Sequence, residues 1–100
     1  MFLVLQRTDL QENAPATFDV DAVRCLVVDL EGTIRAWAVT GPAARDAHRT
    51  AVQDGRLCCP LHGWPVGPDE SRCGALEGCC YRPLGVTLHG EEVRVDLGPR

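Results

Sequence analysis

The sequence predicts an all-β fold, a small antiparallel sandwich or barrel. Short apolar or alternating segments, separated by turn residues, occupy both ends of the chain, and this pattern is typical of antiparallel strands. The chain has 100 residues, enough for one hydrophobic core. It contains no internal repeat and no low-complexity linker. We therefore expect a single domain over residues 1–100.

The first forty residues read as four short strands. The apolar runs and alternations place these strands at Phe2 to Leu5, Thr17 to Val20, Val23 to Asp29 and Thr33 to Val39. Asp21-Ala22 is expected to form a tight turn between the second and third of them, and Glu31-Gly32 leads into the fourth. These segments are predicted to make an antiparallel sheet.

A second β region ends the chain. Gly85 to Leu88 and Glu92 to Leu97 are expected to form a hairpin around a turn at His89-Gly90. In its second strand one face would carry Val93, Val95 and Leu97, and the other Glu92, Arg94 and Asp96. This alternation predicts a half-buried strand.

The segment between the two β regions, Thr40 to Arg82, is rich in glycine, proline and cysteine. Only Gly55 to Cys58 looks strand-like, and Ala43 to Val52 favours a helical turn. A long irregular segment inside a compact domain is often functional, and this one holds five of the six cysteines and two of the three histidines. We interpret residues 40–82 as a functional subdomain mounted on a sheet formed by residues 1–39 and 83–97.

Charge and hydropathy exclude some classes of partner. The net charge is -4, and all ten basic residues are arginine, so no basic surface for nucleic acid is expected. No apolar run reaches membrane-spanning length, and the N-terminal run Met1 to Leu5 lacks the features of an export signal. The expected location is the cytoplasm, without nucleic-acid or membrane binding.

Six cysteines are many for a chain of this length. Because cytoplasmic thiols are normally held reduced, metal ligation is expected ahead of disulfide formation. Cys25 lies within the apolar run Cys-Leu-Val-Val and is predicted to be a buried, inert thiol. The remaining five cysteines lie in the segment from Thr40 to Arg82.

The stretch Cys59-Pro-Leu-His-Gly-Trp64 places a thiol and an imidazole three positions apart. With Asp54-Gly-Arg-Leu57 before it and Pro83-Leu84 and the final hairpin after it, the stretch resembles the second ligand loop of Rieske-type 2Fe-2S ferredoxin domains. The strands that end in Gly32-Thr-Ile-Arg-Ala-Trp37 are similar to the N-terminal sheet of that family. The resemblance implies a Rieske-like antiparallel β sandwich or barrel with an inserted cluster-binding subdomain.

The resemblance also implies a ligand set. The family holds its cluster with Cys-x-His from one loop and Cys-x-x-His from the other, two thiolates on one iron and two imidazoles on the second. Cys59 and His62 match the second loop, and His48 matches the histidine of the first. Asp46 stands where the family has its first cysteine, and only ten residues, Arg49 to Cys58, separate His48 from Cys59. That separation is shorter than the family's usual one.

The fourth ligand is left open at this point. A carboxylate from Asp46 is a hard donor where the cluster prefers soft thiolate, although such ligation is chemically possible. A nearby thiol could replace it, and the candidates are Cys58, Cys73, Cys79 and Cys80. Cys58 is disfavoured because adjacent side chains on an extended segment point to opposite faces.

Three functions follow from these features, in order of preference. The first is a small Rieske ferredoxin-like carrier that passes single electrons from a reductase to an oxygenase or similar partner. The second is a cluster-free accessory subunit, similar to the small subunit of nitrite reductase, that positions a catalytic partner. The third is a zinc-binding structural variant that uses the clustered cysteines and His62. The sequence shows no nucleophile, general base or phosphate loop for independent catalysis.

If a cluster is present, the resemblance implies one of low potential. High-potential members place serine and tyrosine hydroxyls close to the second loop, and neither residue type stands beside Gly63-Trp64. Trp37 and Trp64 are interpreted as packing aromatics.

Overall fold

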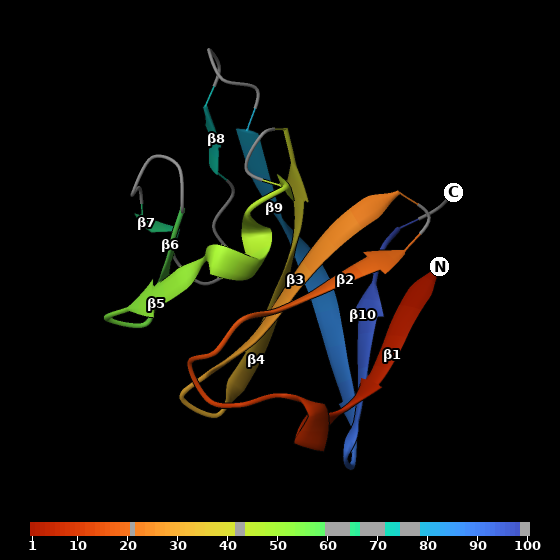
Figure 1. The fold of residues 1–100 in the computed structure, drawn as a ribbon. Coiled ribbons are helices and arrows are strands. Elements are labelled where there is room, and N and C mark those ends of the chain that lie inside the picture. The colour runs from red at the N-terminus through yellow and green to blue at the C-terminus, as the bar shows by residue number, and fades with distance from the viewer. Residues whose placement is uncertain (21, 42–43, 60–64, 67–71, 75–78, 99–100) are drawn as a thin grey trace.

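The computed structural model describes residues 1–20, 22–41, 44–59, 65–66, 72–74 and 79–98, with only the backbone described at 72–74 and 79. Within these residues, antiparallel strands form one seven-stranded sheet and one three-stranded sheet (Figure 1). The large sheet has the order β1-β10-β9-β4-β3-β2, with β8 also paired to β9. The small sheet has the order β5-β6-β7. The predicted all-β, antiparallel class is confirmed.

The strands of the large sheet come from both ends of the chain. Their bounds are β1 Phe2–Gln6, β2 Ala16–Val20, β3 Val23–Leu30, β4 Thr33–Thr40, β8 Arg72–Gly74, β9 Cys79–His89 and β10 Glu92–Asp96. A short 3₁₀ turn, η1 (Arg7–Asp9), follows β1. The chain ends lie side by side, since Leu97 N donates to the Met1 carbonyl across 2.9 Å (Figure 1).

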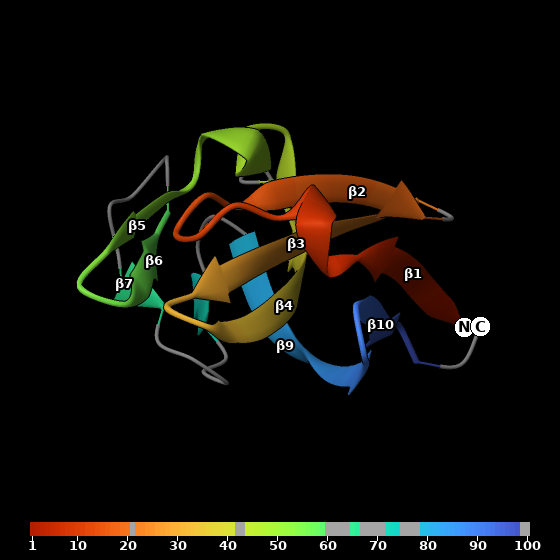
Figure 2. The same ribbon diagram turned by 90° about the horizontal axis from the view of Figure 1, so that it is seen from below.

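The small sheet is inserted between β4 and β9. It consists of β5 Ala51–Gln53, β6 Arg56–Cys58 and β7 Pro65–Val66, and the 3₁₀ turn η3 (Ala47–Arg49) precedes it. Figure 2 shows this sheet at the side of the molecule opposite the two termini. The inserted segment therefore lies away from the chain ends.

The central strands β3 and β4 are buried on both faces, which explains their near-continuous apolar sequences. On one face, a first cluster contains Leu26, Val28, Leu30, Trp37, Val39, Leu57, Cys59, Val66 and Tyr81. On the other face, a second cluster contains Leu5, Leu10, Cys25, Val27, Ile34, Ala36, Val93, Val95 and Leu97. The first cluster joins the small sheet to the large one. The second cluster packs strands of the large sheet, among them β1, β3, β4 and β10, against one another.

The β3–β4 and β5–β6 turns each contain two successive residues with positive φ. Glu31 and Gly32 both have positive φ (54° and 96°), as do Asp54 and Gly55 (53° and 72°). Two successive positive φ values are the signature of the tight turns that suit twisted antiparallel strands. In the first turn the Asp29 carboxylate accepts a hydrogen bond from Gly32 N across 2.7 Å.

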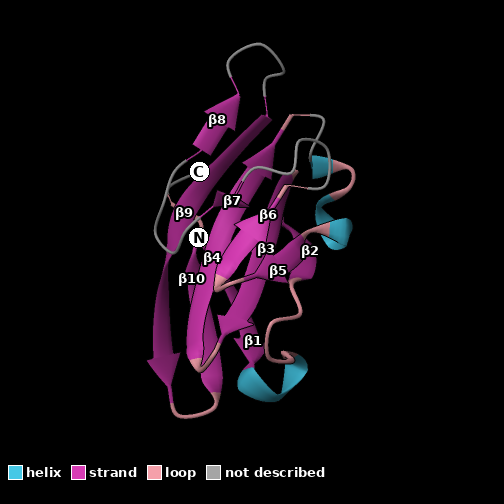
Figure 3. Cartoon of the chain, turned by 90° about the vertical axis from the view of Figure 1, so that its left-hand side faces the viewer, coloured by secondary structure: helices cyan, strands magenta, loops and turns pink. Residues whose placement is uncertain are grey.

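The structure differs from the sequence-based expectation in four elements. Strand β9 begins at Cys79 rather than near Gly85, and β5, β7 and β8 were not expected as strands. They are two or three residues long, too short for a recognisable alternation. The last hairpin turns at Gly90-Glu91 instead of His89-Gly90, because His89 still pairs with Glu92. Figure 3 shows β8 alongside the first part of β9.

No helix among the described residues is long and apolar enough to cross a membrane.

Candidate functional site

The first candidate loop is the segment that carries Asp46 and His48. Arg24 on β3 anchors the start of this loop to the large sheet. Its Nη1 donates to the Ala44 carbonyl across 3.1 Å, and its Nη2 donates to the Asp19 carboxylate across 3.1 Å. Arg24 Nε also hydrogen-bonds to Asp19. The ion pair between β2 and β3 therefore directs one guanidinium nitrogen to the backbone at the start of this loop.

The turn η3 carries two of the candidate ligands. Ala47 is fully buried, whereas Asp46 is half-buried and His48 is exposed. Arg49 N donates to the Asp46 carbonyl across 2.8 Å and Thr50 N to the Ala47 carbonyl across 3.0 Å, which closes the turn. Burial of Ala47 thus fixes the turn to the sheet and leaves His48 outside. The helical turn expected within Ala43 to Val52 is present.

The Asp46 carboxylate does not cap this turn. The residue occupies the N-cap position of η3 with φ -108° and ψ 17°, but its side chain makes no capping hydrogen bond. An aspartate at an N-cap often accepts a hydrogen bond from a backbone N–H of the first turn. The structure therefore gives Asp46 no helix-capping function.

The second candidate loop begins at the buried end of β6. Leu57 is fully buried and Cys59 is 2% exposed, while Cys58 between them is half-buried. This alternation confirms that Cys58 points away from Cys59. Cys58 Sγ instead lies 3.8 Å from Gln53 Oε1 on β5. Cys58 is therefore poorly placed to share a ligand set with Cys59.

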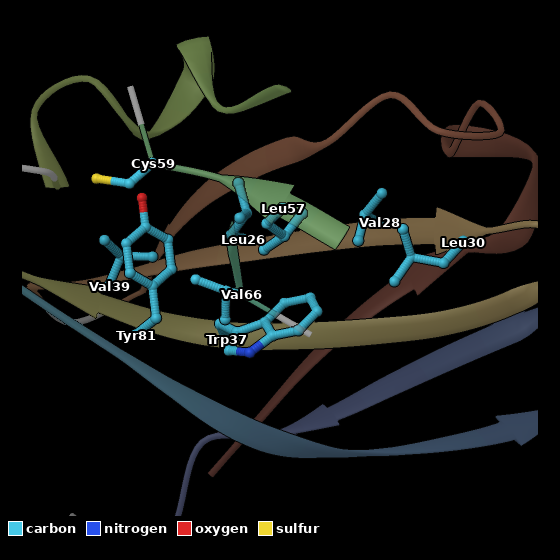
Figure 4. Close-up of a cluster of buried hydrophobic side chains, with 9 residues drawn as sticks. All are labelled: Leu26, Val28, Leu30, Trp37, Val39, Leu57, Cys59, Val66 and Tyr81. Carbon is cyan, nitrogen blue, oxygen red and sulfur yellow. The ribbon is translucent and has the colours of Figure 1, made fainter. Parts of the chain in front are cut away.

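Tyr81 on β9 supplies a polar group beside Cys59. Its side chain is fully buried in the first cluster, and Figure 4 shows its hydroxyl turned toward Cys59. Val39 on β4 lies beside the tyrosine ring in the same view. Cys59 therefore lies at the edge of the first cluster, next to a phenolic hydroxyl.

The sequence did not indicate this role for Tyr81. Only residues next to Gly63-Trp64 were considered as sources of a hydroxyl near the second loop. Tyr81 is 22 positions further along the chain than Cys59 and reaches it because β9 pairs with β4, with Tyr81 opposite Val39. The sequence offers only a single tyrosine within the irregular segment, and this signal is too weak to assign a contact.

Cys80, near the start of β9, has a different status from the one expected. Cys80 is disulfide-bonded, so in this state it offers no thiolate to a metal. The backbone places Cys73 opposite Cys80. The side chains of Cys73 and Cys79 lie outside the described part, and so does the whole of His62.

The described residues fit the cluster only in part. They contain no group of three or more His, Cys, Asp or Glu side chains that could hold a metal ion. Cys59 is a buried soft donor at the expected position, whereas Asp46 is a hard donor in the place of a thiolate. Burial and donor type thus suit Cys59 to a cluster ligand, whereas Asp46 departs from the standard ligand set.

Burial also affects Cys25, in the second cluster. Loss of solvent raises the pKa of the Cys25 thiol, and the nearby Asp19 carboxylate raises it further. Cys25 is fully buried, which confirms the expectation of a buried thiol. Trp37, likewise fully buried, is confirmed as a packing aromatic, and Trp64 lies outside the described residues.

A hollow of about 230 Å³ lies between the β3–β4 and β5–β6 turns. It is lined by Leu30, Glu31, Thr33, Arg35 and Gly55. None of the candidate ligands lines it. The hollow is therefore separate from the candidate site.

Solved structures similar to this chain include an oxygenase ferredoxin and a nitrite reductase small subunit. The ferredoxin of carbazole 1,9a-dioxygenase from Nocardioides aromaticivorans IC177 matches with a TM-score of 0.67 and 19% identity, over 92% of each chain. A putative small subunit of NADPH nitrite reductase matches with a TM-score of 0.65 and 15% identity, over 96% of this chain and 98% of that one. No family model and no curated protein matches the sequence. At these identities the likeness shows the fold, and the chain has the Rieske-like fold of both proteins.

Proposed function

We propose that this chain is a non-catalytic component of an oxidoreductase, a Rieske ferredoxin-like carrier that passes single electrons to a protein partner. The observation that carries the proposal is the environment of Cys59. Its thiol is buried at the end of β6, where the second ligand loop of the fold would begin, with the Tyr81 hydroxyl turned toward it. A 2Fe-2S cluster, when bound, supplies one-electron transfer.

In this proposal Cys59 and His62 hold the cluster from the second loop, and His48 and Asp46 from the first. The anchoring of the first loop supports it, because Arg24 holds the Ala44 backbone and Ala47 is buried beneath the turn. Asp46 is the weakest member, since its carboxylate is a hard donor. A carboxylate ligand would lower the affinity for the cluster and change its potential.

A cluster-free accessory subunit is the second candidate. It is favoured by Asp46 at the position of a ligating thiol and by the short separation between His48 and Cys59. A fold can persist after its site is lost. In that case the chain would bind and position a catalytic partner, and Cys59 would serve only as a packing residue of the first cluster.

The partner in both cases is another protein, a reductase or an oxygenase. The support is the fold, since the similar chains include a dioxygenase ferredoxin and a protein described as a nitrite reductase small subunit. We further propose a cytoplasmic location, where electron carriers of this kind meet their reductases.

The deciding experiment is the iron, zinc and acid-labile sulfide content of protein purified without oxygen, with a reduced-state EPR spectrum. A 2Fe-2S complement with a Rieske-type signal is the expected result. Zinc without sulfide would support the structural zinc site instead. A folded, metal-free protein after anaerobic reconstitution would reject the carrier and leave the accessory role.

A pair of neighbouring cysteines provides the control. Cys59→Ala should abolish the cluster, whereas Cys58→Ala should retain it, because the two side chains point to opposite faces of β6. Asp46→Cys should increase cluster retention by restoring a thiolate. Equal retention in Cys59→Ala and Cys58→Ala would reject Cys59 as a ligand.

A further inference from the structure

The disulfide at Cys80 has only two possible partners within the chain. Of the six cysteines, Cys25, Cys58 and Cys59 are reduced, and Cys80 is disulfide-bonded. The two that remain are Cys73 and Cys79. The choice between them is decided by backbone geometry.

The register of the strands favours Cys73. Cys73 on β8 and Cys80 on β9 are direct Cα partners in an antiparallel pair. Such partners lie roughly 4.5–5.5 Å apart, within the usual Cα separation of about 4.4–6.8 Å for a disulfide. Cys79 is the chain neighbour of Cys80, so the two Cα atoms are only about 3.8 Å apart and the side chains of consecutive strand residues point to opposite faces.

We propose that Cys73 and Cys80 form a cross-strand disulfide that clamps β8 onto β9, and that opening this bond releases β8. Within the described residues, β8 is three residues long and pairs only with β9. Because β4 takes the other edge of β9 at residues 80–84, β8 lies on the edge that β10 occupies further along, at residues 85–89. The clamp therefore holds β8 over the first part of this edge of β9, before the part that β10 occupies.

The bond is open to exchange chemistry. Cys80 is half-buried rather than fully buried, and exchange begins when a thiolate attacks one of the two sulfurs. A dithiol reductant would attack one sulfur to form a mixed disulfide and then close on itself. The products are two cysteine thiols and one oxidised dithiol, with two electrons and two protons transferred to the protein. Cys73 and Cys80 become available as thiols only in the reduced state.

Peptide mapping tests the pairing. Cleavage after glutamate separates residues 71–77 from residues 78–91, which places Cys73 on one peptide and both other cysteines on the second. Under non-reducing conditions the two peptides should be linked, and the link should persist in Cys79→Ser and disappear in Cys80→Ser. A link that survives in Cys80→Ser, an internal bond within 78–91, or free thiols at all three positions would overturn the pairing.

Limited proteolysis of the wild-type protein tests the clamp. Trypsin can cut after Arg72, within β8, and after Arg56, within β6 of the small sheet. Dithiothreitol should accelerate cleavage at Arg72 several-fold while leaving Arg56 unchanged. Cys79→Ser should behave as the wild type, and Cys80→Ser should be cut rapidly with or without reductant. Equal cleavage at Arg72 in the oxidised and reduced wild type would overturn the clamp. This comparison uses only the wild-type protein and does not depend on whether Cys80→Ser folds.

Discussion

Arg24 and Ala44 are 20 positions apart in sequence, and the guanidinium of the first donates a 3.1 Å hydrogen bond to the carbonyl oxygen of the second. The same guanidinium is held by the Asp19 carboxylate. The β2–β3 hairpin thus fixes the start of the segment that carries Asp46 and His48. The first candidate loop is ordered by the sheet rather than by its own short turn.

Removal of this anchor should weaken the fold. We expect Arg24→Met to lower the free energy of unfolding by about 1–2 kcal/mol, because a partly buried charged hydrogen-bond donor is lost to both Asp19 and Ala44. Urea denaturation measures the change. The control is Arg94→Met, which removes an exposed 3.4 Å pair with Glu92 and should cost under about 0.5 kcal/mol. Equal costs for the two variants would contradict the anchoring role.

The attachment of the small sheet depends on Leu57. This fully buried residue of β6 belongs to the cluster that contains Trp37 and Leu26 of the large sheet. We expect Leu57→Ala to destabilise the protein by about 2–5 kcal/mol through lost burial and a cavity. Leu88→Ala, at a residue 44% exposed, should cost much less in the same denaturation experiment. A small effect of Leu57→Ala would mean that the small sheet contributes little to the core.

The raised pKa of Cys25 predicts a pH dependence. The unfolded thiol ionises near its ordinary pKa of 9.0, whereas burial and Asp19 keep the folded thiol protonated to higher pH. The folded state therefore binds the proton more tightly, and its stability falls as the pH rises from 9.0 toward the folded pKa.

Denaturation at a series of pH values above neutrality measures this fall. Cys25→Ala should show a shallower decline than the wild type, although it is less stable throughout because the buried sulfur is lost. An unchanged slope would show that Cys25 does not contribute. Alkylation gives an independent check, since half-buried Cys58 should react before fully buried Cys25.

Two exposed apolar side chains lie on the edge strand β1. Phe2 is 59% exposed and Val4 51% exposed, and both stand on the same face of the strand. Exposed apolar edges promote association between chains. We expect Phe2→Ser to change the free energy of unfolding by less than about 0.5 kcal/mol while reducing self-association at high concentration, measured by light scattering.

Leu5→Ser on the same strand is the contrasting variant for Phe2→Ser. Leu5 is 6% exposed and belongs to the second cluster, so its replacement by a polar residue should strongly destabilise the fold. A strong loss of stability in Phe2→Ser would instead show that this phenylalanine packs against the protein.

Much of the large sheet could be predicted from local pattern. The alternation of Val93 and Val95 with Arg94 predicts a half-buried strand, and the apolar run around Cys25 predicts another, and both strands are present. The small strands could not be predicted in this way. Pro65–Val66 is two residues long and is a strand only because it pairs with Leu57 and Cys58. Such pairing is set by distant chain segments rather than by local propensity.

The sequence by itself determined the all-β class, the main strands and the positions of the candidate ligands, because strand periodicity and ligand spacing are local properties. Only the tertiary structure decided that Arg24 anchors the first loop, that Tyr81 faces Cys59, and that Cys80 is bonded rather than available to a metal. These relationships depend on strand register and burial. Both arise when distant segments pack together, and local sequence does not encode which of several cysteines or hydroxyls will meet.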